Sequence, residues 1–178
     1  MRRFSKWLGV GIIGLLMVSC ASQPVSPPSE WRYEKEAVHV HLKADPQLNL
    51  YQGNPHTLLL CIYQLTDPNA FNQLSQDENG LYKLLECANF DSSVANSKRL
   101  IVHPGQEMTT QLDRAEGAKY VAVVAGYYTV ERKGMVRLYD IPWYVEKSGF
   151  LGQNKVAKPG PLEIDLKLGS QQIQAVGE

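Results

Sequence analysis

Apolar and polar residues alternate along two segments of the chain, which predicts strands with one buried face. In residues 38–42, three apolar residues alternate with His39 and His41. Four apolar residues alternate with polar ones in the same way between residues 162 and 168. Gly169-Ser170 then turns the chain into residues 173–176, so a hairpin is expected to close the domain.

Two other segments, residues 57–65 (TLLLCIYQL) and 120–128 (YVAVVAGYY), are apolar at nearly every position. Strands of this kind are covered on both faces. We therefore expect each of them to pack against a second sheet on one side and against another element on the other side.

Turn residues divide the remaining strand-like regions. Residues 99–103 and 107–112 flank the turn dipeptide Pro104-Gly105 and are expected to pair as a hairpin. Residues 136–145 predict a further strand that is interrupted at Pro142, because proline cannot donate a ladder hydrogen bond.

One stretch departs from the strand pattern and predicts a helical insertion. Asp67 is expected to cap a short helix whose first residue is Pro68. A second short helix is expected from Leu81, with Asp77 or Asn79 as its cap. Together these segments predict an all-β fold, a two-sheet β-sandwich with a short helical insertion between the second and third strands that covers residues 57–65.

The first 19 residues predict an export signal. Three of the first six residues are basic, and the uncharged run at 7–18 has 12 residues, against roughly 20 needed to cross a bilayer. Cys20 follows the small residue Ser19, which is typical of a bacterial lipoprotein signal whose cysteine is acylated and becomes the first mature residue. An ordinary signal peptide with an incidental cysteine is the alternative.

The residues after the cysteine predict the membrane in which the protein is located. Ala21 stands where an aspartate would favour retention in the inner membrane, so we expect the inner leaflet of the outer membrane, facing the periplasm. Residues 20–36 are rich in Pro and Ser and are interpreted as a tether that reaches about 50 Å at most. Trp31 and Tyr33 are expected to dock on the domain or to lie at the lipid headgroups. Residues 37–178 form the folded domain.

Net charge excludes one class of partner. The chain has 18 basic and 18 acidic residues, and loss of the signal with Arg2, Arg3 and Lys6 leaves 15 basic residues, a net charge of −3. A strongly basic surface for nucleic acid is therefore excluded, and no nucleic-acid partner is expected.

Two cysteines remain once Cys20 is acylated. Cys61 lies on the buried strand and Cys87 at the end of the helical insertion. In an oxidising compartment an even pair favours a disulfide, which here would close a loop of about 25 residues and contribute about 3–4 kcal/mol. Two buried free thiols are the alternative.

Several short motifs follow one another along residues 38–176. They are Leu48-Asn49, Gly53-Asn54-Pro55, the run 62–65 with Asp67 and Phe71, the segment 102–105 and the strand 120–128. Together with the lipoprotein signal, the Pro-rich tether and the order of strands, these motifs make residues 38–176 resemble the TssJ (SciN, VasD) family of type VI secretion system outer-membrane lipoproteins. In place of the Trp-Arg pair common on a later strand of the family, this chain has Val136-Arg137, and the Cys61/Cys87 pair is not part of the general pattern.

The resemblance implies a transthyretin-like fold and binding of the periplasmic C-terminal region of the inner-membrane protein TssM. The contact loop of the family corresponds to residues 45–56. Leu48 and Leu50 are interpreted either as contact residues or as plugs for the end of the sandwich, whereas Tyr51 is a favoured type of interface anchor. The expected contact residues are Leu48, Asn49, Leu50, Tyr51, Gln52 and Gly53.

Nothing in the sequence indicates catalysis. Motifs of serine hydrolases and zinc proteases are absent from it, and no cofactor or small-molecule substrate is expected. His39 and His41 are two apart on one strand face, which suits a metal pair, but no third ligand is suggested and a solvated face explains them better. The alternatives to the secretion role are a pilotin-like lipoprotein and a ligand-binding or inhibitor-type periplasmic β-sandwich.

Overall fold

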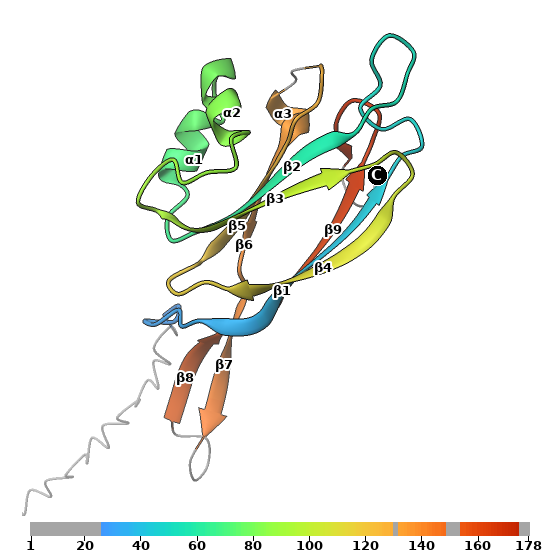
Figure 1. The fold of residues 1–178 in the computed structure, drawn as a ribbon. Coiled ribbons are helices and arrows are strands. Elements are labelled where there is room, and N and C mark those ends of the chain that lie inside the picture. The colour runs from blue at the N-terminus through green and yellow to red at the C-terminus, as the bar shows by residue number, and fades with distance from the viewer. Residues whose placement is uncertain (1–25, 130–131, 149–153, 175–178) are drawn as a thin grey trace, which may run out of the picture.

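The computed structural model describes residues 26–129, 132–148 and 154–174 (Figure 1). The predicted signal and Cys20, the predicted site of acylation, lie outside this range. None of the described helices is long and apolar enough to span a membrane. The helices are α1 (Asn69–Leu74), α2 (Glu78–Leu84) and α3 (Arg132–Met135). The strands are β1 (Glu34–Ala44), β2 (Leu58–Leu65), β3 (Val94–Val102), β4 (Glu107–Arg114), β5 (Tyr120–Ala125), β6 (Val136–Asp140), β7 (Trp143–Ser148), β8 (Asn154–Pro159), β9 (Leu162–Leu168) and β10 (Ile173–Gln174).

Two four-stranded sheets face each other, which confirms the predicted sandwich. Their strand orders are β10-β9-β1-β4 and β3-β2-β5-β6, while β7 and β8 form a separate two-stranded sheet. β1 pairs antiparallel with β4 and parallel with β9. The insertion α1–α2 lies between β2 and β3 along the chain, as predicted.

The alternating pattern of β1 sorts its side chains between the core and the outer face. Val38, Val40 and Leu42 are fully buried between the sheets, and they lie beside Leu162, Ile164 and Leu166 of β9 in a parallel register. The two strands predicted from alternation therefore form the centre of one sheet.

β2 is covered on both faces, as its continuous apolar sequence predicts. Leu58, Leu60 and Ile62 enter the inter-sheet core. Tyr63 points to the other side, under the helices, where its hydroxyl donates a hydrogen bond to the Leu84 carbonyl at 2.5 Å. Burial there raises the pKa of Tyr63 to about 12.

A disulfide joins Cys61 of β2 to Cys87, 26 positions later in the sequence and just beyond α2. It fixes the end of the helical insertion on the outer face of the sheet, which is the arrangement that the spacing of the two cysteines favoured. By closing this loop, the disulfide raises the free energy of unfolding by about 3–4 kcal/mol, because it reduces the entropy of the unfolded chain.

The predicted hairpin around Pro104-Gly105 is wrong. Val102 at the end of β3 pairs with Leu58 of β2, whereas Glu107 at the start of β4 pairs with Lys43 of β1 in the opposite sheet. The turn therefore carries the chain from one sheet to the other. A Pro-Gly dipeptide predicts that the chain reverses direction, but it does not determine whether the two flanking strands pair with each other.

Other boundaries differ by a few residues. β5 ends at Ala125, so the last three residues of the predicted strand 120–128 leave the sheet. α1 begins at Asn69 with Pro68 in the cap position, and the Asp67 carboxylate accepts from the Asn69 amide at 2.8 Å. α2 begins at Glu78, earlier than predicted, because Asp77 caps it through the Gly80 amide.

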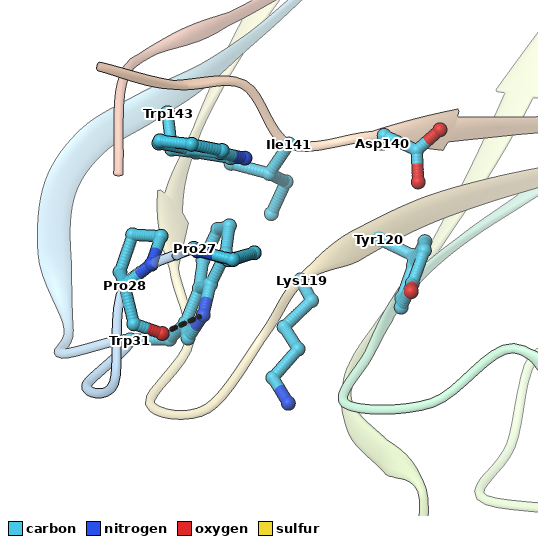
Figure 2. A pocket seen from close by; sticks show the side chains of 8 residues that line it. All are labelled: Pro27, Pro28, Trp31, Lys119, Tyr120, Asp140, Ile141 and Trp143. Atoms are coloured by element: carbon cyan, nitrogen blue, oxygen red, sulfur yellow. Dashed lines mark hydrogen bonds between the residues drawn. The ribbon is translucent and has the colours of Figure 1, made fainter. Parts of the chain in front are cut away.

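The segment before β1, residues 26–33, packs on the domain, and we call it the N-terminal strap. Trp31 is buried against the core, its indole N–H donates to the Pro28 carbonyl (Figure 2), and its own carbonyl accepts from the Gly117 amide at 2.6 Å. The buried guanidinium of Arg114 pairs with Glu34 at 2.8 Å and donates to the Arg32 carbonyl. β1 itself begins three residues before the predicted domain boundary at residue 37.

Candidate partner-binding surface

The loop between β1 and β2 is held in place mainly by its own backbone. The Asp45 amide donates to the Leu168 carbonyl at 2.8 Å, and the Leu50 amide donates to the Ser170 carbonyl at 2.7 Å. Both acceptors belong to the end of β9 and the turn after it. The loop therefore lies against a neighbouring turn of the same sheet.

Two of the expected contact residues support the loop from inside. Leu48 is fully buried in the inter-sheet core and closes the end of the sandwich. Asn49 is also buried; its amide group donates to the Thr57 carbonyl and its oxygen accepts from the Tyr128 amide, each at 2.9 Å. Asn49 has a positive φ of 50°, which asparagine tolerates better than most residues. Leu48 and Asn49 are therefore correctly located in the loop but do not face solvent, while Leu50 is partly exposed.

The tip of the loop is a tight two-residue turn. The amides and carbonyls of Tyr51 and Asn54 exchange two hydrogen bonds of 3.0 Å. Gln52 and Gly53 between them both have positive φ, 50° and 77°, the geometry of a type I′ turn. The tip is thus a small closed hairpin with a defined shape.

Three rings gather beside this turn, and we call Tyr51, His56 and Tyr128 the aromatic cluster. Tyr51 stacks on Tyr128 with ring centroids 4.7 Å apart, and His56 meets Tyr128 edge to face at 5.0 Å. Tyr51 and Tyr128 remain 46% and 55% exposed. The ring nitrogen Nδ1 of His56 is buried and has no hydrogen-bond partner among the described residues.

Sequence reasoning named Tyr51 for contact but missed His56 and Tyr128. The sequence places Tyr128 at the end of the predicted strand 120–128, and His56 only as the last residue of the loop 45–56. Gly126 is the sequence feature that could have placed Tyr128 outside the strand, because glycine within a strand pattern often marks a bulge or the end of the strand. The stacking with Tyr51 joins two segments that are 77 positions apart in the sequence, and only the fold shows it.

The histidines on β1 serve cross-strand contacts. His39 bonds to the Glu163 carboxylate at 2.6 Å and to the Glu36 carbonyl at 2.7 Å, and these bonds to acceptors raise the pKa of His39. His41 bonds to the Thr109 hydroxyl at 3.1 Å. Within the ranges that the structure describes, no group of three or more His, Cys, Asp or Glu side chains is placed to hold a metal ion.

Fold and surface together define a β-sandwich module that displays a rigid aromatic loop at one end. Residues 36–167 match the family of type VI secretion lipoproteins described as VasD, EvfM and TssJ, and the chain belongs to this family. A comparison with curated proteins gives no match.

Solved structures share this fold. The T6SS lipoprotein TssJ1 from Pseudomonas aeruginosa is 23% identical with a TM-score of 0.59, and the match covers 84% of this chain and 96% of that one. Lip from Serratia marcescens, a membrane-bound component of the type VI secretion system, is 21% identical with a TM-score of 0.60, covering 79% and 97%. A chain in a structure described as the T6SS protein TssM C-terminal domain from EAEC is 16% identical with a TM-score of 0.57, covering 79% and 98%.

Proposed function

We propose that this protein is an outer-membrane-anchored periplasmic lipoprotein of the type VI secretion membrane complex. In this proposal its aromatic cluster and loop tip bind the periplasmic C-terminal region of TssM. Family membership supports the secretion role. A chain of the same fold also occurs in a structure described as the TssM C-terminal domain. The observation that carries the proposal is the exposed, stacked pair formed by Tyr51 on the hydrogen-bonded loop tip and Tyr128 after β5.

The construction of this loop suits protein binding. Tyrosine supplies a large contact area with few rotatable bonds, so it loses little entropy when a partner covers it. The turn at Gln52-Gly53 and the buried Asn49 fix the rings before a partner arrives. Preorganisation of this kind lowers the entropic cost of association. Tyr51, Tyr128, Leu50 and Gln52 are therefore assigned to the contact, with Gly53 shaping the turn.

The interior of the domain does not favour a carrier of small ligands. Buried side chains from both sheets fill the space between them in one continuous cluster. A ligand carrier requires an apolar cavity of several hundred Å³ with a few polar groups directed into it. The depressions around the strap and β7–β8 are open to solvent and lie outside the sandwich core. The pilotin-like alternative is likewise not favoured.

Binding of the TssM periplasmic region to the purified lipoprotein tests the assignment. Because central aromatic anchors contribute at least about 2 kcal/mol, Tyr51→Ala and Tyr128→Ala should each weaken binding roughly 30-fold. Leu50→Asp should also weaken it, because it places a charge beside the rings. Tyr82→Ala is the matched control, since Tyr82 is 54% exposed on α2.

The outcomes separate the parts of the proposal. Unchanged binding by Tyr51→Ala, Tyr128→Ala and Leu50→Asp would show that the wrong surface has been assigned. Failure of the unmodified protein to bind TssM would overturn the partner itself. Equal losses for Tyr82→Ala and Tyr51→Ala would point to general damage to the fold instead of a local contact.

A further inference from the structure

The N-terminal strap shortens the connection between the domain and its predicted lipid anchor. Trp31 is buried, and the Tyr33 hydroxyl donates to Asp113 at 2.5 Å. Ser26 is the first described residue of the docked segment. Only six steps of chain separate it from Cys20, a reach of about 20 Å at most. The strap end of the domain therefore stays close to the membrane that holds the acyl chains.

The hairpin of β7 and β8 shares this end of the molecule (Figure 1). A depression of about 540 Å³ lies between strap and hairpin, with Tyr33 on one side and Tyr144 and Val156 on the other. A second depression, of about 380 Å³, is lined by Pro28, Trp31 and Trp143 (Figure 2). We call the strap and the hairpin together the anchor end.

This hairpin exposes apolar side chains on both faces. In the part of the chain that the structure describes, β7 and β8 pair only with each other. The register places Tyr144 and Val156 on one face and Trp143 on the other. All three are substantially exposed, Val156 at 49%. A two-stranded hairpin is marginally stable in water, and exposed apolar groups on both faces indicate a contact that covers them.

The charges on the hairpin indicate what kind of surface makes that contact. Lys147 and Lys155 lie directly opposite each other, and like charges in this position destabilise a strand pair. Glu146 pairs with Lys158 instead. No other ion pair involves a hairpin lysine among the described residues. An anionic phospholipid surface would offset the repulsion and favours contact about fivefold for each lysine.

We propose that the β7–β8 hairpin contacts the phospholipid surface in which the acylated Cys20 is embedded. Tryptophan and tyrosine prefer the headgroup region, where one side of the ring is apolar and the other is wet. Lys147 and Lys155 share the Trp143 face, opposite to Tyr144 and Val156. The hairpin therefore enters the headgroup layer with both faces in contact with it, so that the two lysines meet lipid phosphates and Val156 meets the same layer from the other side. This inference rests on the lipid anchor of the proposed function, but not on the binding of TssM.

The contact would fix the orientation of the whole domain relative to the membrane. β1 has 11 residues and spans about 35 Å. It begins beside the strap and ends at the loop that carries the aromatic cluster, at the opposite end of the molecule in Figure 1. With one end on the lipid, the aromatic cluster points away from the membrane.

A fluorescent probe on the hairpin tests the contact. The variant Val156→Cys in the full lipidated protein is labelled with nitrobenzoxadiazole and placed on vesicles of phosphatidylethanolamine and phosphatidylglycerol. Cys61 and Cys87 do not react because they form a disulfide. The probe should become several-fold brighter and shift to the blue. The matched control, Gln52→Cys at the opposite end, should emit as it does in water.

Charge reversal gives a second measurement on the same vesicles. Lys147→Glu combined with Lys155→Glu should lower the ratio of lipid-bound to free hairpin at least about 25-fold, since each lysine favours contact about fivefold. The protein itself should still float with the vesicles, because its acyl chains remain.

The results of these two experiments distinguish failure of the hairpin contact from failure of the lipid anchor. If the labelled protein floats but the Val156→Cys probe behaves like the Gln52→Cys probe, the contact is overturned and the anchor stands. If the unmodified chain does not float, both are overturned. If the probe shifts only after addition of the TssM periplasmic region, the hairpin binds protein and not lipid.

Discussion

The two ends of the sandwich both hold irregular chain in a fixed position, but they use different groups to do so. At the anchor end, Trp31 of the strap is buried against the core, and the buried guanidinium of Arg114 donates to the Arg32 carbonyl of the strap. At the opposite end, the loop after β1 is held by backbone hydrogen bonds and by the buried Asn49. The rings of Tyr51 and Tyr128 there remain exposed.

This difference separates a structural role from a binding role. A buried tryptophan or arginine stabilises its own domain and has little surface left for a partner. An exposed ring on a backbone-fixed turn contributes little to folding and keeps its surface free. Rigidity combined with exposure is therefore the better indicator of a binding surface than either property alone.

The largest expected effect concerns the proposed lipid anchor. If Cys20 carries the proposed acyl chains, Cys20→Ser should release the protein completely from the outer-membrane fraction, because several acyl chains would supply the stable attachment. Cell fractionation and immunoblotting measure this. The released chain should still bind the TssM periplasmic region in solution. Continued retention of the variant in cells that lack TssM would show that a second anchor exists.

Truncation of one aromatic side chain at each end should separate their roles. Trp31→Ala should lower the free energy of unfolding by about 3 kcal/mol, since it removes a large buried ring. Tyr51→Ala should cost about 1 kcal/mol or less, the value of an exposed aromatic pair. Denaturant unfolding of both variants checks the contrast.

Proteolysis adds a second test of this contrast, because Trp31→Ala should also free the strap for cleavage. Trp31→Phe is the control and should retain most of the stability. Equal losses of stability for Trp31→Ala and Tyr51→Ala would remove the distinction between the two ends.

The pattern of apolar and polar residues predicted most of the fold, because a strand with one buried face alternates between apolar and polar residues. β1 and β9 alternate, and β2 is apolar throughout, so their faces followed from the sequence. The pairing of strands did not follow in every case. Residues 94–102 and 107–114 are adjacent in the chain, yet they lie in different sheets. The partners that decide this, β2 and β1, are distant in sequence.

The candidate surface was predictable only in part. Leu48 and Tyr51 are both apolar or aromatic loop residues, and the sequence does not show which one is buried. Tyr128 belongs to the surface only because β5 ends at Ala125 and the chain then passes the loop. The position of the strap was likewise not predictable from its composition. Its Pro-rich sequence is typical of a tether, but the burial of Trp31 holds it on the domain.

The turn at the tip of the β1–β2 loop offers a smaller and more local test. Gln52 occupies a left-handed position where asparagine is preferred in type I′ turns. Gln52→Asn should therefore stabilise the turn by about 0.5 kcal/mol. The Tyr51 and Asn54 amides should then exchange hydrogen more slowly, as measured by NMR.

Gly53→Ala is the matched opposite change. Open space surrounds this position, so the cost of about 1 kcal/mol comes from its φ of 77° and not from a clash. Slower exchange in both variants would show that the turn geometry has been assigned incorrectly.

The smallest effect concerns pH and the strand that joins the two ends. The pKa of His39 is raised by its bond to Glu163 and, second, by its bond to the Glu36 carbonyl, so folding favours the protonated ring. The stabilisation is full below the unfolded pKa of 6.5 and is lost as pH rises through the higher folded pKa. Thermal unfolding should therefore show a slightly greater loss of stability in the unmodified protein than in His39→Gln as the pH rises above 6.5. Because His39 lies in the middle of β1 and touches neither the aromatic cluster nor the hairpin, TssM binding and vesicle contact should show no matching difference between these two proteins. A His39-dependent change in either would mean that β1 couples the two ends, and they would then no longer be independent regions.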